Sequence, residues 1–138
     1  MKKPALILLA AVTLAVATIY AQGATTNDGI GTDAQVKRGN DTYQAQCAVC
    51  HDPQLSGSGT APPLAGTDFM ANWKNENVNS LFERIRATMP ADNPGSLKRD
   101  QVADIIAFIL NFNKFPLAQK DLPAESESLK AIKIVAPR

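Results

Sequence analysis

Three stretches of the chain carry apolar residues at helical spacing, and each predicts an amphipathic helix. The first is expected to run from about Asp33 to about Cys47. Thr32 and Gln35 stand three residues apart, as in a capping box, and mark where this helix begins. Its predicted buried face consists of Val36, Gly39, Tyr43 and Cys47.

The second and third helices follow later in the chain. The second must stop before the Met89-Pro90 pair, because proline disfavours helical backbone at the residue that precedes it. The third covers about residues 98–112, shows the strongest pattern, and has Ser96 as its expected N-cap. The apolar positions that predict these two helices are Val78, Leu81, Phe82 and Ile85, and then Val102, Ile105, Ile106, Ile109 and Phe112.

Between these helices the chain is rich in residues that break regular structure. Residues 52–67 contain three prolines and three glycines, which excludes a long helix or strand and predicts a loop that wraps around something. Phe69 and Trp73, four residues apart, suit one short helical stretch. No two segments carry a hairpin signal, so the expected fold class is all-α, with three main helices plus loops.

The N-terminus has the composition of an export signal. Lys2 and Lys3 precede an uncharged apolar run from Ala5 to Ala17. Ala21 is a small residue at which a peptidase could cut, so residues 1–21 are predicted to be a signal peptide. The alternative is an uncleaved anchor, the one case in which the protein would contact a membrane. Either way the domain is expected outside the cytoplasm, and we predict a periplasmic protein.

Removal of that signal would leave about 117 residues, which suits one small domain and excludes a large two-domain enzyme. Both charged residues lost with it are lysines, so the remaining chain carries a net charge of −1. A near-neutral domain lacks the strongly basic face of proteins that bind nucleic acid or anionic membranes. We therefore expect neither as a partner.

Cys47, Cys50 and His51 form the Cys-x-x-Cys-His sequence that attaches c-type haem. At the end of a helix, positions i, i+3 and i+4 share one face, so two thiols can bond the vinyl groups while the imidazole reaches the iron. Structural zinc needs four ligands, and the chain has no further Cys or His. A thioredoxin-like pair needs a βαβ setting, and a plain disulfide leaves His51 unexplained. Covalent haem c is the expected cofactor.

The iron needs a sixth ligand, and a second histidine does not occur in the sequence. The strong candidates that remain are Met70 and Met89. Met89 is favoured because it follows a helix on a loop where Pro90 restricts the backbone. Met70 lies between Phe69 and Trp73, where methionine more often fills a core.

With these residues in view, the chain resembles the class I c-type cytochromes over nearly all of its predicted mature length. The matching motifs are Gly39, Tyr43 and Cys47 to His51, the Pro-x-Leu-x-Gly loop from Pro62 to Gly66, and Thr88-Met89-Pro90. The resemblance implies a cytochrome c-like fold around one covalently bound haem, with His51 and Met89 as axial ligands. The cytochrome c domain is then expected at residues 30–115. Residues 116–138 would be an extension that packs on the domain or is frayed.

A narrower resemblance points to the cytochrome domains or subunits associated with quinoprotein alcohol dehydrogenases. It rests on motifs of the second half: Leu81-Phe82, Thr88-Met89-Pro90 with Pro94 to Leu97, Ala103 to Ile105, and Phe115-Pro116 to Leu122-Pro123. Asp52 departs from the pattern, since that family often has glycine after the haem histidine.

The resemblance also implies haem contacts. The carbonyl of Pro62 would accept the Nδ1–H of the proximal histidine, which fixes the ring and tunes its basicity. Trp73 and Arg86 are candidates to bond the propionates, although an aromatic core residue and a solvated charge explain them equally well. Apolar side chains would wall the macrocycle, namely Leu64, Phe82, Ile85 and Ile109.

These expectations describe an electron carrier rather than an enzyme. One-electron transfer would run from a dehydrogenase, with a quinoprotein as the candidate, to an oxidase or another cytochrome, and the chain could serve as a subunit of a dehydrogenase complex. A haem peroxidase or a gas sensor would need an open or labile iron position, which Met89 would fill.

Overall fold

In the computed structural model, residues 23–138 are described, so the predicted signal peptide falls outside the described part of the chain. The described elements are a 3-10 helix and six α-helices, with isolated bridges but no β-strand among these residues. They are η1 (Thr26–Asp28), α1 (Asp33–Gln46), α2 (Ala48–His51), α3 (Gly66–Trp73), α4 (Val78–Thr88), α5 (Arg99–Phe112) and α6 (Ser126–Lys130). The all-α prediction is confirmed.

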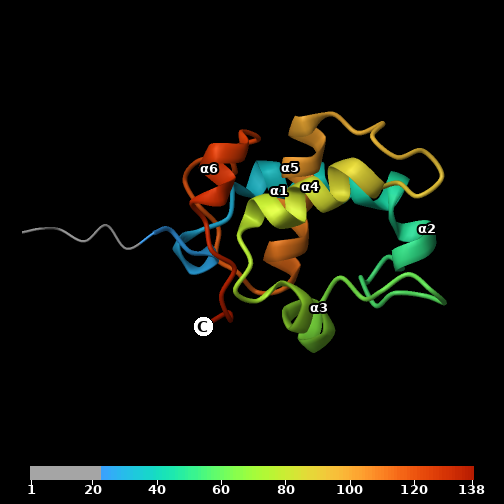
Figure 1. The fold of residues 1–138 in the computed structure, drawn as a ribbon, viewed down its shortest axis with the longest axis horizontal. Coiled ribbons are helices and arrows are strands. Elements are labelled where there is room, and N and C mark those ends of the chain that lie inside the picture. Colours follow the sequence, from blue (N-terminus) through green and yellow to red (C-terminus); the bar gives the residue numbers. More distant parts are fainter. Residues whose placement is uncertain (1–22) are drawn as a thin grey trace, which may run out of the picture.

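Helix α5 is the centre of the fold, and every residue from Val102 to Leu110 is buried. Helix α1 crosses it at Gly39, where no side chain separates the two backbones, and an added Cβ would lie only 2.9 Å from that of Phe108. The rings of Tyr43 and Phe108 pack beside this crossing, with centroids 5.2 Å apart. In Figure 1, α1, α4 and α5 lie together in the middle of the molecule.

Two details at the helix starts differ from the predictions. Thr32 does cap α1, accepting a hydrogen bond from the Gln35 backbone N–H, but the Gln35 side chain does not return to Thr32. Instead it bonds both backbone groups of Leu122, 87 residues away. Ser96 is not the cap of α5, because the N-cap lies two residues later at Lys98, whose N–H donates to the Gln101 side chain.

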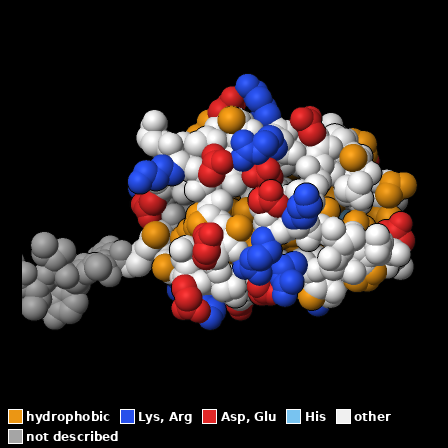
Figure 2. All heavy atoms as spheres, turned by 90° about the horizontal axis from the view of Figure 1, so that it is seen from above, with side chains coloured by type: hydrophobic (Ala, Val, Ile, Leu, Met, Phe, Trp, Pro, Cys, Tyr) orange, Lys and Arg blue, Asp and Glu red, His pale blue; other side chains and the backbone are white. Residues whose placement is uncertain are grey.

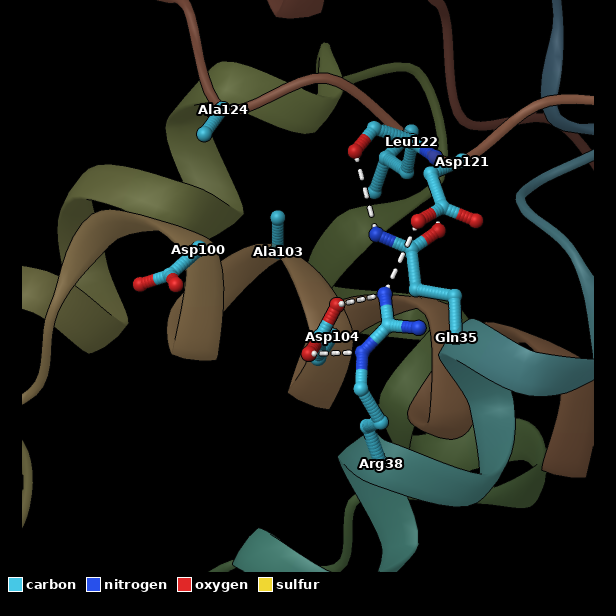
Figure 3. Close-up of a pocket in the computed structure, with 8 residues that line it drawn as sticks. All are labelled: Gln35, Arg38, Asp100, Ala103, Asp104, Asp121, Leu122 and Ala124. Atoms are coloured by element: carbon cyan, nitrogen blue, oxygen red, sulfur yellow. Dashed lines mark hydrogen bonds and ion pairs between the residues drawn. The ribbon is translucent and has the colours of Figure 1, made fainter.

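The segment after Pro116 runs back along the domain (Figure 1). Arg38 on α1 holds it by bonding Asp121 while also pairing with Asp104 of α5 (Figure 3). The segment is not extended throughout, since Leu129 is buried within helix α6. Farther on, Ile134 is buried and its N–H bonds the Glu76 carbonyl.

Charges on the surface are mixed in sign. Figure 2 shows Lys and Arg side chains interspersed with Asp and Glu over the middle of the face, without a block of one sign. This agrees with the near-neutral charge of the chain. Among residues 23–138, no helix combines the length and the apolar character needed to cross a membrane.

Candidate haem-binding site

Two cysteines and a histidine meet on the short helix α2. Cys47 terminates α1, and its carbonyl accepts hydrogen bonds from the N–H groups of Cys50 and His51, at 3.2 and 2.9 Å. This helical turn places the three residues on one face. The two thiols are not joined in a disulfide, and Cys47 is half-buried while Cys50 is exposed. Burial raises the pKa of the Cys47 thiol to about 11, so this sulfur is protonated at neutral pH.

His51 is oriented by the loop that follows it. Its side chain is buried, and Nδ1 lies 2.9 Å from the Pro62 carbonyl oxygen, the contact implied by the family resemblance. The main chain is fixed as well, since the Gly57 N–H bonds the His51 carbonyl at 3.0 Å. With Nδ1 as the donor in this pair, Nε2 is the nitrogen left to bind a metal.

The loop from Asp52 to Ala65 folds closely against itself. The Leu64 N–H bonds the Leu55 carbonyl at 2.8 Å, and the buried Leu55 side chain anchors the turn. Gly57 has φ +76°, and a Cβ there would stand 2.6 Å from the Ala61 carbonyl oxygen, so glycine is required. The Tyr43 hydroxyl donates to the Asp52 carbonyl, which ties the loop to α1.

The backbone conformation of Asp52 suits glycine, the residue that the resembled family often has after the haem histidine. Its φ is +69°, in the left-handed region that glycine enters without cost. Aspartate is one of the few other residues that adopt this conformation, helped by local hydrogen bonds. Here its carboxylate accepts the Gln54 N–H at 2.7 Å, which also lowers the pKa of Asp52.

The two methionine candidates occupy different parts of the molecule. Met89 directly follows α4, is half-buried, and is held by its N–H bond to the Ile85 carbonyl. In Figure 1, α2 and the loop after α4 lie at the same end of the long axis. Met70 lies on α3, where it lines a hollow of about 430 Å³ together with Phe112 and Pro137.

The other predicted haem contacts are placed as follows. Phe82 and Ile109 are buried, whereas Leu64 and Ile85 are half-buried at the edge of the core. Trp73 ends α3 and is also half-buried. Arg86 is exposed and pairs with Glu83 one turn earlier, with Nε and Oε2 3.0 Å apart.

One residue that the sequence did not single out as functional bonds the end of the loop that follows His51. Asn113, at the end of α5, is buried and bonds the backbone of Leu64 and Gly66 through its side-chain amide. An asparagine just after a helix usually indicates a C-terminal cap. The neighbouring sequence therefore does not reveal that its hydrogen-bond partners lie 47 to 49 residues away.

The donor set fits covalent haem. Two unpaired thiols and an imidazole with only Nε2 available share one helical face, as thioether attachment and axial ligation require. In the described part of the chain, no three His, Cys, Asp or Glu side chains form a group suited to a metal ion, and no strand supports a thioredoxin-like arrangement.

Comparison with known proteins agrees with this geometry. The fold is similar to that of a chain in the sulfane dehydrogenase SoxCD from Paracoccus pantotrophus, with a TM-score of 0.57 and 20% sequence identity. The similarity covers 83% of this chain and 61% of that one, so our chain spans less than two thirds of that protein's length. At this identity the likeness shows the fold alone. No curated protein matches the chain.

A family model does match, over residues 34–109, which is more than half of the chain. Its description is cytochrome c oxidase, cbb3-type, subunit III. The matched range begins in α1 and ends in α5, and it includes Cys47, Cys50 and His51. The chain therefore belongs to this family of cytochrome c domains, which bind haem c covalently and transfer electrons.

Proposed function

We propose that this protein is a periplasmic one-electron carrier in which Cys47 and Cys50 hold haem c and His51 and Met89 are the axial ligands. The observation that carries the proposal is the joint placement of two unpaired thiols and His51 on one helical turn, with His51 Nδ1 at the Pro62 carbonyl. When bound, haem c supplies a one-electron couple between ferrous and ferric iron.

The residues around the site would have three different roles: orienting His51, supplying the second iron ligand and excluding water. Pro62 accepts the Nδ1–H of His51, which holds the ring and makes Nε2 a better donor. Met89 would supply a thioether as the second ligand, a donor that favours ferrous iron. Apolar side chains would surround the haem and exclude water from it, namely Leu64, Phe82, Ile85 and Ile109.

Trp73 and Arg86 belong to the proposal as contacts of the propionates. The Trp73 indole N–H is a donor, and Arg86 would exchange its ion pair with Glu83 for a propionate. That exchange costs little, because an exposed pair contributes little to stability.

The partners we propose are a dehydrogenase as donor and an oxidase or another cytochrome as acceptor. The family description names an oxidase subunit, which supports the acceptor. The motifs shared with cytochromes of quinoprotein alcohol dehydrogenases support a donor of that class. Export to the periplasm rests on the predicted signal peptide at residues 1–21.

Val49 marks the surface where a partner would dock. It stands between the two cysteines, and 89% of its surface is exposed, the highest value among the large apolar residues described. A small apolar contact beside the haem edge suffices for electron transfer. Because charges of both signs are interspersed, electrostatic steering should be weak.

The proposal is tested by stopped-flow reduction of the oxidised holoprotein with candidate dehydrogenases and their substrates, across a range of ionic strength. We expect fast reduction that slows only weakly with salt, and slower reduction of Val49→Asp. Leu117→Asp is the matched control, because Leu117 is also exposed but lies beside Gly29, near η1.

Carbon monoxide separates the carrier from a haem enzyme or a gas sensor. A reduced carrier with both axial positions filled should not bind it at concentrations where an open ferrous haem saturates. Tight binding together with reduction by no donor would refute the carrier role. Reduction by an unrelated dehydrogenase would retain the role and remove the alcohol-oxidation context.

A further inference from the structure

Both polar atoms of the Asn113 side-chain amide form hydrogen bonds with backbone groups of the protein. Only 7% of the residue is exposed. Its Oδ1 accepts the Gly66 N–H at 2.9 Å, and its Nδ2 donates to the carbonyls of Leu64 and Ile109, at 2.9 and 2.8 Å. The amide therefore joins the last turn of α5 to the backbone of a loop 47 to 49 residues earlier.

That loop presents the Pro62 carbonyl to His51, two residues before the Asn113 contacts. Both Pro62 and Pro63 have φ restricted by their rings, so few backbone torsions can absorb movement between Leu64 and Pro62. Leu64 is held at both of its backbone groups, because its N–H bonds the Leu55 carbonyl and its carbonyl accepts from Asn113. Because the two prolines leave few free torsions, a displacement of Leu64 is transmitted to the Pro62 carbonyl.

We propose that Asn113 is a positioning residue for the axial histidine, acting through the Leu64 to Gly66 backbone and the Pro62 carbonyl. The inference rests on the proposed role of His51 as an iron ligand. It adds the residue at the C-terminal end of α5 to the set that tunes the iron, although Asn113 itself need not touch the haem.

The direction of the effect follows from the basicity of the imidazole. A firm bond from Nδ1–H to a carbonyl makes Nε2 more electron-donating, which favours ferric iron. Loss of the Asn113 contacts loosens the loop and weakens that bond. The reduced form should then be favoured, so the midpoint potential should rise.

The test compares Asn113→Leu, which keeps the volume and removes the amide, with the matched variant Asn111→Leu. Asn111 lies on the same helix end, but its Nδ2 donates only to the nearby Phe115 carbonyl, at 3.3 Å. Each holoprotein is titrated spectroelectrochemically under conditions where it is fully folded. We expect Asn113→Leu to raise the ratio of reduced to oxidised protein at a fixed potential at least threefold. Asn111→Leu should change it less than 1.5-fold.

Equal shifts in the two variants, or no shift in Asn113→Leu, would overturn the proposal. Covalent retention of haem is measured on the same samples. If the unaltered protein does not retain haem, the proposed function fails. If haem is retained and the ratio does not move, only the role of Asn113 fails.

A measurement on the unaltered protein covers the case in which Asn113→Leu does not fold. In the reduced holoprotein, hydrogen exchange of the Gly66 N–H and the His51 Nδ1–H is followed by NMR at low denaturant concentrations. If Asn113 links the two sites, both protons should exchange through one opening, with the same dependence on denaturant. A clearly weaker dependence for the His51 proton would show that its bond opens independently of Asn113 and would refute the proposal.

Discussion

Gly39 of α1 lies directly against the backbone of Asp104 in α5, so closely that a Cβ at Gly39 would overlap the Asp104 carbonyl. The Asp104 side chain is gripped at the same point by Arg38, whose Nε and Nη2 donate to its two carboxylate oxygens at 2.9 and 3.1 Å. Helices α1 and α5 can therefore approach this closely because Gly39 has no side chain, and the Arg38–Asp104 ion pair beside Gly39 joins the two helices.

The first prediction concerns this crossing. Gly39→Ala should lower the free energy of unfolding by about 3 kcal/mol, because the atom that the new methyl group meets is backbone and cannot turn away. Chemical denaturation of the holoprotein measures the change. Gly59→Ala is the control: its Cβ would meet nothing within 4 Å, so it should cost only the strain of its positive φ, about 1 kcal/mol. Equal costs would contradict the close crossing.

Covalent attachment gives the second prediction. The unaltered holoprotein should keep its haem through acid-acetone extraction, and the variant with Cys47→Ala and Cys50→Ala should release it, because two thioether bonds are then missing. Absorbance of the protein pellet at the haem band measures retention. Free extraction of the pigment from the unaltered protein would show that the thiols do not bind it.

The sixth ligand can be identified by a third experiment. The oxidised protein should show the weak sulfur-to-iron band at the red edge of the visible spectrum. Met89→Ala should abolish that band, whereas Met70→Leu should keep it, because Met70 lies on α3 beside a hollow lined by Phe112 and Pro137. The opposite result would identify Met70 as the ligand.

The fourth prediction is a pH dependence of stability. Hydrogen bonds from the Thr32 hydroxyl and from Arg38 lower the pKa of Asp121 in the folded protein. The unfolded value is about 3.9, so this stabilisation is present above about pH 4 and is lost as the pH falls through the lowered folded value. Because Asp121 is half-exposed, the effect should be small.

Asp121→Asn should accordingly be less stable than the unaltered protein at pH 7, and this difference should shrink in acid. Denaturation midpoints at pH 7, 4 and 3 measure it. Asp41→Asn, which changes an exposed acid on α1, is the control and should show no such convergence. A difference that stays constant with pH would mean that the Asp121 carboxylate charge does not matter.

The three main helices and the haem-attachment sequence could be predicted because both depend on residues only a few positions apart. Apolar spacing and the Thr32 side chain mark α1, and the Met89-Pro90 pair marks the end of α4. Cys47, Cys50 and His51 belong to one helical turn whatever the rest of the chain does. Even the close helix crossing at Gly39 had a local sign, a glycine within an apolar helical face.

Other features depend on partners that are distant in sequence, and no local pattern reports them. Gln35 looks like half of a capping box, yet its amide bonds Leu122, because a buried amide is satisfied by whichever backbone groups the folded chain brings to it. Asn113 looks like a helix terminator, yet it holds the loop that orients His51. The local sequence places the proposed iron ligands at the ends of two helices, His51 in α2 and Met89 after α4. The packing of α5 against the loop from Asp52 to Ala65 sets how that loop is held.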